Sequence, residues 1–156
     1  MRLFVLLCHD CALRSSTAAA LTWQAIQGDC EEIVTRTKRS AVVRVPISKR
    51  LRTVLQSVPK GDGTLISLLH GSFMCAGRIR KQFRLLTLEA QLPPGIRPHD
   101  LRRTIAQSVY AVTSDLRVAQ SLLGHDNLIS TFRYLAQPSG TTTSRLAEVL
   151  HEVAKR

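Results

Sequence analysis

The chain has 156 residues, a length typical of a single domain with a substantial core. Its 22 lysines and arginines against 11 acidic residues give a net charge of +11, which favours a polyanionic partner, usually nucleic acid. Aromatic residues make up only 4%, which argues against a single-strand binder built on base stacking and favours phosphate contacts from basic side chains.

An apolar run opens the chain and ends at His9-Asp10. No convincing signal-peptidase cleavage site follows it, and no run reaches the ~18 apolar residues of a membrane span. The run therefore predicts a core helix of a cytoplasmic protein. We expect helix over residues 3–21, interrupted near Arg14.

Two of the four cysteines, Cys8 and Cys11, have the spacing of metal ligands. A structural zinc site usually needs a second such pair, and Cys30 and Cys75 do not form one. The pattern predicts free thiols, and we expect no metal and no other cofactor.

Two strands follow, over residues 31–36 and 41–47, the second marked by alternating β-branched residues. The polar residues 37–40 between them predict a hairpin turn. Ser48 is a plausible N-cap for a short helix, and the prolines and glycines of 58–64 indicate a loop.

The second half of the chain predicts helices. They are a basic helix over 72–91, one that opens at Pro98, one over 115–123, a short one that carries Tyr134 and ends before Pro138, and an amphipathic one over 144–154. An apolar stripe is expected on the second of these, formed by Leu101, Ile105, Val109 and Val112. The fold class is therefore α+β and mainly helical, with one small antiparallel sheet, in a single domain over residues 1–156.

His99 and Arg102 stand three positions apart and so share one helix face. A guanidinium can grip two phosphate oxygens, and an imidazole can move a proton near neutral pH. The His-x-x-Arg pattern alone is common in exposed helices. His125 follows a helix-ending glycine and could by itself be a capping residue, and Tyr134, nine positions later, could be ordinary packing.

In combination, these residues resemble the signature of the tyrosine recombinases and phage integrases. His99 and Arg102 are followed by His125 after 23 residues and by Tyr134 after nine more. The stretch from Asp115 to His125 is similar to the Xer-type members of that family. The resemblance covers nearly the whole chain and implies the catalytic-domain fold of DNA breaking-rejoining enzymes.

The resemblance predicts two further site residues upstream, and both are present. Arg14 lies in Ala12-Leu13-Arg14, similar to a Gly-Leu-Arg motif, and Lys38 lies in the expected hairpin, eight residues before Pro46. Lys38 fits the pattern better than Lys49 or Lys60, which fall outside the hairpin.

The resemblance also implies the chemistry. Arg14 and Arg102 neutralise the phosphate, Tyr134 attacks it, and Lys38 protonates the departing 5′ oxygen. His99 assists proton transfer from the tyrosine, and His125 donates a hydrogen bond to a phosphate oxygen. The implied activity is site-specific DNA recombination and integration through a 3′-phosphotyrosine link, without ATP or metal.

The chain departs from the family pattern in three ways. Thr17 occupies the place of an acidic residue expected to orient Arg14, and Ala12 replaces the glycine of the Gly-Leu-Arg motif. The chain begins too close to Arg14 to hold the family's N-terminal core-binding domain, so we expect that domain to be absent.

The resemblance implies double-stranded DNA as partner, a tetramer on DNA, a monomer when free, no membrane association and an origin in a mobile element. Two alternatives stay open. One is a type IB topoisomerase-like or telomere-resolving activity, which shares this chemistry. The other is a truncated integrase remnant that binds DNA without full recombination activity.

Overall fold

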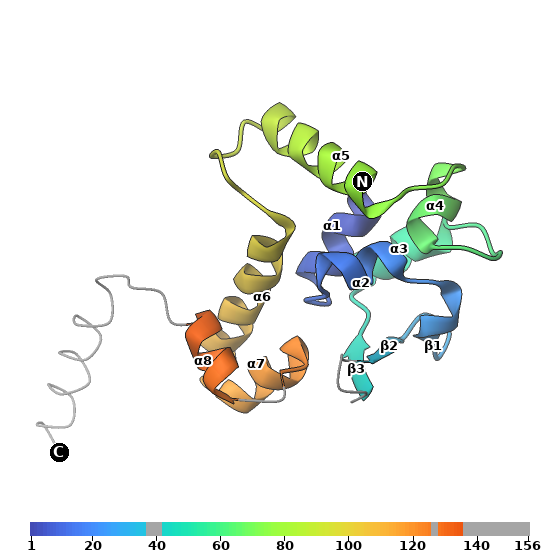
Figure 1. Cartoon of the computed structure of the whole chain (residues 1–156). Coiled ribbons are helices and arrows are strands. Elements are labelled where there is room, and N and C mark those ends of the chain that lie inside the picture. The colour runs from blue at the N-terminus through green and yellow to red at the C-terminus, as the bar shows by residue number, and fades with distance from the viewer. Residues whose placement is uncertain (37–41, 126–127, 136–156) are drawn as a thin grey trace, which may run out of the picture.

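The structure is a computed structural model that describes residues 1–36, 42–125 and 128–135 (Figure 1). The side chains of Leu128, Arg133 and Tyr134 lie outside this description, as do the predicted hairpin turn and the predicted helix over 144–154. The described part is mainly helical with one three-stranded antiparallel sheet, which confirms the predicted fold class.

The first third of the chain forms two helices, a short 3-10 turn and the sheet. In chain order they are α1 (Arg2–His9), α2 (Ser15–Ala20), η1 (Trp23–Ala25), β1 (Ile26–Gln27), β2 (Glu32–Arg36) and β3 (Val42–Pro46). The predicted interruption near Arg14 is the turn between α1 and α2, and both predicted strands are confirmed. In the sheet β2 is central, and Ile33 pairs with Ile26 on β1 and with Val45 on β3. Strand β1 was not predicted because only two residues form it.

Three helices follow the sheet: α3 (Lys49–Gln56), α4 (Leu65–His70) and α5 (Ala76–Glu89). Ser48 caps α3 as predicted, because its side chain accepts a hydrogen bond from the backbone N–H of Leu51. The predicted helix over 72–91 is too long. Residues 72–75 are a connection after Gly71, whose left-handed φ of 68° ends α4, and the basic helix begins only at Ala76.

The last described helices are α6 (Pro98–Thr113), α7 (Leu116–Leu123) and α8 (Leu128–Leu135). Pro98 is the first residue of α6 and Gly124 ends α7 at a φ of 55°, both as predicted. The predicted helix over 115–123 begins one residue later, because Asp115 is the N-cap of α7 and accepts a hydrogen bond from the backbone N–H of Arg117. In Figure 1, α6 leads away from the end of α5, and α7 and α8 pack beside its second half.

The predicted apolar stripe of α6 is only partly confirmed. Leu101, Ile105 and Val109 are partly buried, but Val112 is 86% exposed. The fully buried positions of this helix are Arg102 and Ala106. A charged residue thus takes the most enclosed face of α6.

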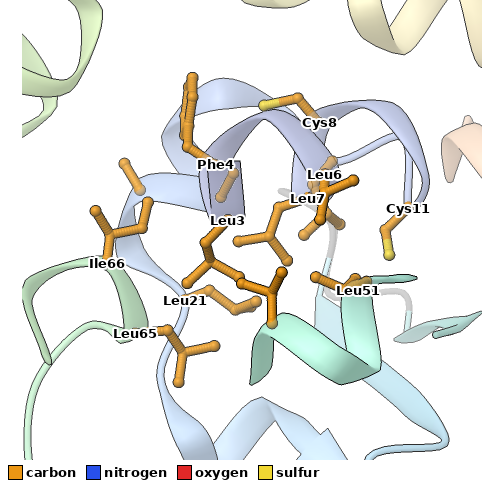
Figure 2. Close-up of a cluster of buried hydrophobic side chains, with 14 of the residues drawn as sticks. Leu3, Phe4, Leu6, Leu7, Cys8, Cys11, Leu21, Leu51, Leu65 and Ile66 are labelled. Atoms are coloured by element: carbon orange, nitrogen blue, oxygen red, sulfur yellow. The ribbon is translucent and has the colours of Figure 1, made fainter. Parts of the chain in front are cut away.

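The main core lies between α1 and its neighbours (Figure 2). The cluster contains Leu21, Leu51, Leu65 and Ile66 from the elements that follow α1, together with the buried residues of α1, which are Leu3, Phe4, Leu6, Leu7 and Cys8. Phe4 of α1 also contacts Phe83 of α5 edge to face, with ring centroids 6.2 Å apart. Helix α1, which the opening apolar run predicts, is therefore the centre of the domain.

A second, smaller cluster joins the α1–α2 turn to the C-terminal helices. It contains Ala12, Ala106 and Leu123, with Ile105, Leu122 and Leu135 packed against it. This cluster brings together segments that are about a hundred residues apart in the sequence. The candidate site lies over it.

None of the helices in the described part of the chain combines the length and the hydropathy that a membrane crossing requires.

Candidate active site

Arg102 is the structural centre of the site. Its side chain is buried, with 3% exposed, and its guanidinium donates to two backbone carbonyls. One acceptor is the oxygen of Ala12, and the other is that of Leu123, 2.5 Å from Nη2. These carbonyls lie two residues before Arg14 and two before His125. One side chain therefore fixes both turns from which predicted site residues project.

The turn that carries Arg14 has an unusual backbone. Ala12 has a φ of 49°, in the left-handed region where a side chain costs about 1–2 kcal/mol. Its side chain is fully buried. The expected glycine would adopt this φ without strain, so the alanine is a costlier change than the sequence suggests. Arg14 follows in extended conformation as the first flanking residue of α2 and is exposed.

A salt-bridge cluster holds the start of this turn. Asp10, at the end of α1, accepts hydrogen bonds from Ser48 at 2.5 Å and from Arg50 Nε at 2.7 Å. Its side chain is 5% exposed. Burial would raise the pKa of Asp10, but the hydrogen bonds from Arg50, Ser48 and His9 outweigh it and lower the pKa from 3.8 to about 2. The cluster ties the end of α1 to the start of α3.

One pocket brings Arg14 and Arg102 together. It is lined by the α1–α2 turn, the ends of β2 and β3, and the turn at Gly124. Arg36, from the end of β2, lines it as well, and none of the described residues around it is acidic. Three arginines around one pocket suit an anionic group such as a phosphate. Thr17, which stands where an acidic residue was expected, also lines the pocket.

Sequence reasoning missed Arg36. Its signal was its place two residues before Lys38, at the end of the β2–β3 pair that leads into the predicted hairpin turn, where it pairs with Val42. A strand arginine in a basic chain is otherwise unremarkable, and only the tertiary structure places it beside Arg14.

His99 lies in the first turn of α6, three residues before Arg102, and is exposed. Partial desolvation lowers its pKa, and the positive charge of Arg102, with smaller contributions from Arg103 and Arg14, lowers it further against the opposing effect of Asp100. The lowered pKa favours the neutral imidazole, which is the form that can accept a proton.

His125 is held by two neighbouring helices. Its backbone N–H donates to Gln120 O at 3.2 Å, and Gln120 Nε2 donates to His125 O at 2.8 Å, so α7 fixes its main chain. Its Nδ1 lies 3.1 Å from Oγ1 of Thr131 on α8. Neither Gln120 nor Thr131 was singled out from the sequence, because their partners are set by the turn between the helices.

The remaining two predicted residues are placed only in part. Tyr134 lies in α8, three residues after Thr131, as predicted, but its side chain is outside the described part. Lys38 lies outside the described residues altogether. The strands on either side of it are described, and the end of β2 borders the pocket.

The two cysteines with metal-ligand spacing are enclosed in the core. Cys8 and Cys11 are buried free thiols, and burial raises the pKa of each to about 12. Within the described residues no group of three histidines, cysteines or carboxylates could hold a metal ion.

The sequence matches the profile of the phage integrase family over residues 1–139. The chain belongs to the phage integrase family. Among its relatives, the tyrosine recombinase XerC of Chromobacterium violaceum is 31% identical over 136 residues, which are 83% of this chain and 46% of that protein. XerC of Rhodospirillum centenum is 32% identical over 139 residues, 85% of this chain and 40% of that protein. The chain thus spans less than half the length of these relatives.

Solved structures of the family share the fold. The catalytic domain of bacteriophage HP1 integrase matches with a TM-score of 0.64 at 28% identity, over 91% of this chain and 78% of that one. The XerA recombinase matches with a TM-score of 0.72 at 19% identity, over 92% of this chain and 54% of that one. The described helices and sheet therefore form the catalytic-domain fold of the tyrosine recombinases.

Proposed function

We propose that the chain is the catalytic domain of a site-specific tyrosine recombinase and cleaves and rejoins double-stranded DNA. The observation that supports this most is the convergence at one pocket of Arg14, Arg102 and the turn that carries His125, from three separate segments. An uncatalysed phosphodiester resists attack because it is anionic and because its alkoxide leaves poorly. A site rich in guanidinium donors addresses the first difficulty.

In the proposed reaction the scissile phosphate binds at this pocket. Arg14 and Arg102 stabilise the negative charge that builds on its non-bridging oxygens, and His125 donates a hydrogen bond to one of them. Arg102 would do this from a buried position, where its charge is little screened. Its contacts to Ala12 and Leu123 hold its orientation in advance.

Tyr134 then attacks phosphorus through its phenolic oxygen, and the bond from phosphorus to the 5′ oxygen breaks. His99 takes up the phenol proton, a role that suits its lowered pKa, and Lys38 gives a proton to the 5′ oxygen. The product is a 3′-phosphotyrosine and a free 5′-hydroxyl. Attack by the 5′-hydroxyl of a second strand reverses the step and gives strand exchange, so the reaction needs no outside energy source.

The partner is proposed to be double-stranded DNA, bound largely through phosphate contacts, as the net charge of +11 favours. A monomer in solution and a tetramer on DNA, action on DNA in the cytoplasm, and an origin in a mobile element belong to the same proposal. They rest on membership of the family.

The test is covalent trapping. The full chain is incubated with a pool of nicked duplexes whose sequence is randomised around the nick. Cleavage near the nick releases a short fragment, so rejoining cannot occur and the protein stays covalently attached to the DNA. A protein–DNA adduct that survives denaturant in the parent and is lost in Tyr134→Phe supports the proposal. DNA binding without any adduct would leave only a DNA-binding remnant and would overturn the recombinase assignment.

A further inference from the structure

A side-chain contact links His125, which is proposed to bind the phosphate, to α8, the helix that carries the proposed nucleophile Tyr134. Thr131 is fully buried, with 0% exposed, and its Oγ1 lies 3.1 Å from Nδ1 of His125. It stands one turn before Tyr134 on the same helix. A hydroxyl buried this completely needs a hydrogen-bond partner, and the imidazole supplies one.

The main chain of His125 is already fixed by its two hydrogen bonds to Gln120. The freedom that α7 leaves is therefore the rotation and the tautomer of the ring. A neutral imidazole carries its proton on one nitrogen and accepts a hydrogen bond at the other. If Nδ1 accepts, the proton sits on Nε2, which is then a donor.

We propose that Thr131 is a positioning residue of the reaction. Its hydroxyl donates to Nδ1 of His125 and so holds the ring in the Nε2–H tautomer that can donate to a phosphate oxygen. Because Thr131 belongs to α8, the same contact fixes the position of the His125 ring relative to the helix that carries Tyr134. This inference rests on the proposed function, in which His125 contacts the phosphate.

Three variants of the full chain test it. Thr131→Val keeps the shape and removes the hydroxyl, Thr131→Ser keeps the hydroxyl, and Ser130→Ala removes an exposed neighbouring hydroxyl as a matched control. Circular dichroism confirms that each is folded. The first readout is the ¹⁵N NMR spectrum of the His125 ring in the free protein, at a pH where the ring is neutral.

We expect the Nε2–H tautomer in the parent, in Thr131→Ser and in Ser130→Ala, and a mixture of tautomers in Thr131→Val. The second readout is the rate of adduct formation on the nicked-duplex pool. We expect it to fall about tenfold or more in Thr131→Val, the scale of one lost hydrogen bond to a reacting group, and to recover in Thr131→Ser.

Slower cleavage with an unchanged tautomer would show that Thr131 only supports the fold and would overturn the proposal. A changed tautomer with unchanged cleavage would overturn it equally. If the parent itself forms no adduct, the proposed function fails, while the NMR comparison still decides whether Thr131 sets the tautomer of His125.

Discussion

Arg102 is proposed both to hold two turns of the fold together and to stabilise the phosphate. Replacing it by lysine tests both roles, because lysine keeps the charge but loses the planar, multi-donor guanidinium. Two nitrogens of the arginine donate to the carbonyls of Ala12 and Leu123. A lysine has one terminal nitrogen, which cannot occupy both donor positions at once. At least one buried carbonyl then loses its partner, at a cost of about 1–3 kcal/mol. For a domain of this size such a loss lowers Tm by roughly 2–12 °C.

The same substitution should reduce cleavage by about 10² or more, the scale of removing one preorganised donor at a developing charge. The assays are thermal unfolding followed by circular dichroism, which gives Tm, and adduct formation on nicked duplexes. Arg84→Lys is the control, since Arg84 is exposed on α5, away from the pocket. It should change neither quantity.

Two results would refute this reasoning. An Arg102→Lys protein as stable as the parent would show that the two turns do not depend on the guanidinium. Near-normal cleavage would show that Arg102 does not act on the phosphate, and Arg103 would be the next residue to examine.

The remaining predictions concern acid stability, the proton acceptor and the leaving group. Asp10 has a folded pKa of about 2 against an ordinary 3.8, so its stabilising effect is present above about pH 4 and is lost as the pH falls towards 2. Thermal unfolding of Asp10→Asn should therefore depend less on pH in this range than that of the parent. Arg14→Gln should raise the pKa of His99, measured by NMR titration, because the positive charge of Arg14 contributes to lowering it. A substrate with sulfur in place of the 5′-bridging oxygen should restore cleavage to Lys38→Ala, since a thiolate leaves without protonation.

One result would contradict each of these three predictions. An acid transition identical in Asp10→Asn and the parent would show that the cluster at the end of α1 does not hold the turn electrostatically. An unchanged or lower pKa of His99 in Arg14→Gln would show that the charge of Arg14 does not act on His99. A sulfur substrate that the parent cleaves and Lys38→Ala does not would remove lysine from the role of general acid.

The local rules predicted most helix ends. Ser48 was predicted as an N-cap, Pro98 as the start of a helix and Gly124 as the end of one, and the structure confirms all three. Helix α4 was missed although Thr64 and Gly71 delimit it, because six residues are too few for a convincing apolar pattern. Local signals identify an element only when it is long enough to show its period.

Packing decided what local rules could not. Periodicity predicted Val112 on the buried face of α6, yet this residue is 86% exposed, because periodicity alone does not show how far the packing of neighbouring elements reaches along a helix. The same helix buries Arg102, since the carbonyls of two distant turns satisfy its charge. The strain at Ala12, the approach of Arg36 to the pocket and the contact of Thr131 with His125 likewise depend on segments that are far apart in the sequence or on turns that only the fold defines.

The candidate site was predictable as a set of residue types, but not as a geometry. Arg14 and Arg102 were expected at one phosphate, and the structure brings them to one pocket. The burial of Arg102 and its hydrogen bonds to two backbone carbonyls were not predicted, because the sequence suggests an exposed helix face. Lys38 and the side chain of Tyr134 remain predictions.

The most direct measurement identifies the amino acid that becomes attached to DNA. The chain has two tyrosines, and trypsin would place them in separate peptides, Tyr110 in 104–117 and Tyr134 in 134–145. After trapping on the nicked-duplex pool, nuclease digestion leaves a nucleotide remnant on the attacked residue, and mass spectrometry locates it. We predict the remnant on the peptide 134–145. A remnant on 104–117 would contradict the assignment of Tyr134 as nucleophile, and an adduct on a residue other than tyrosine would contradict the proposed mechanism itself.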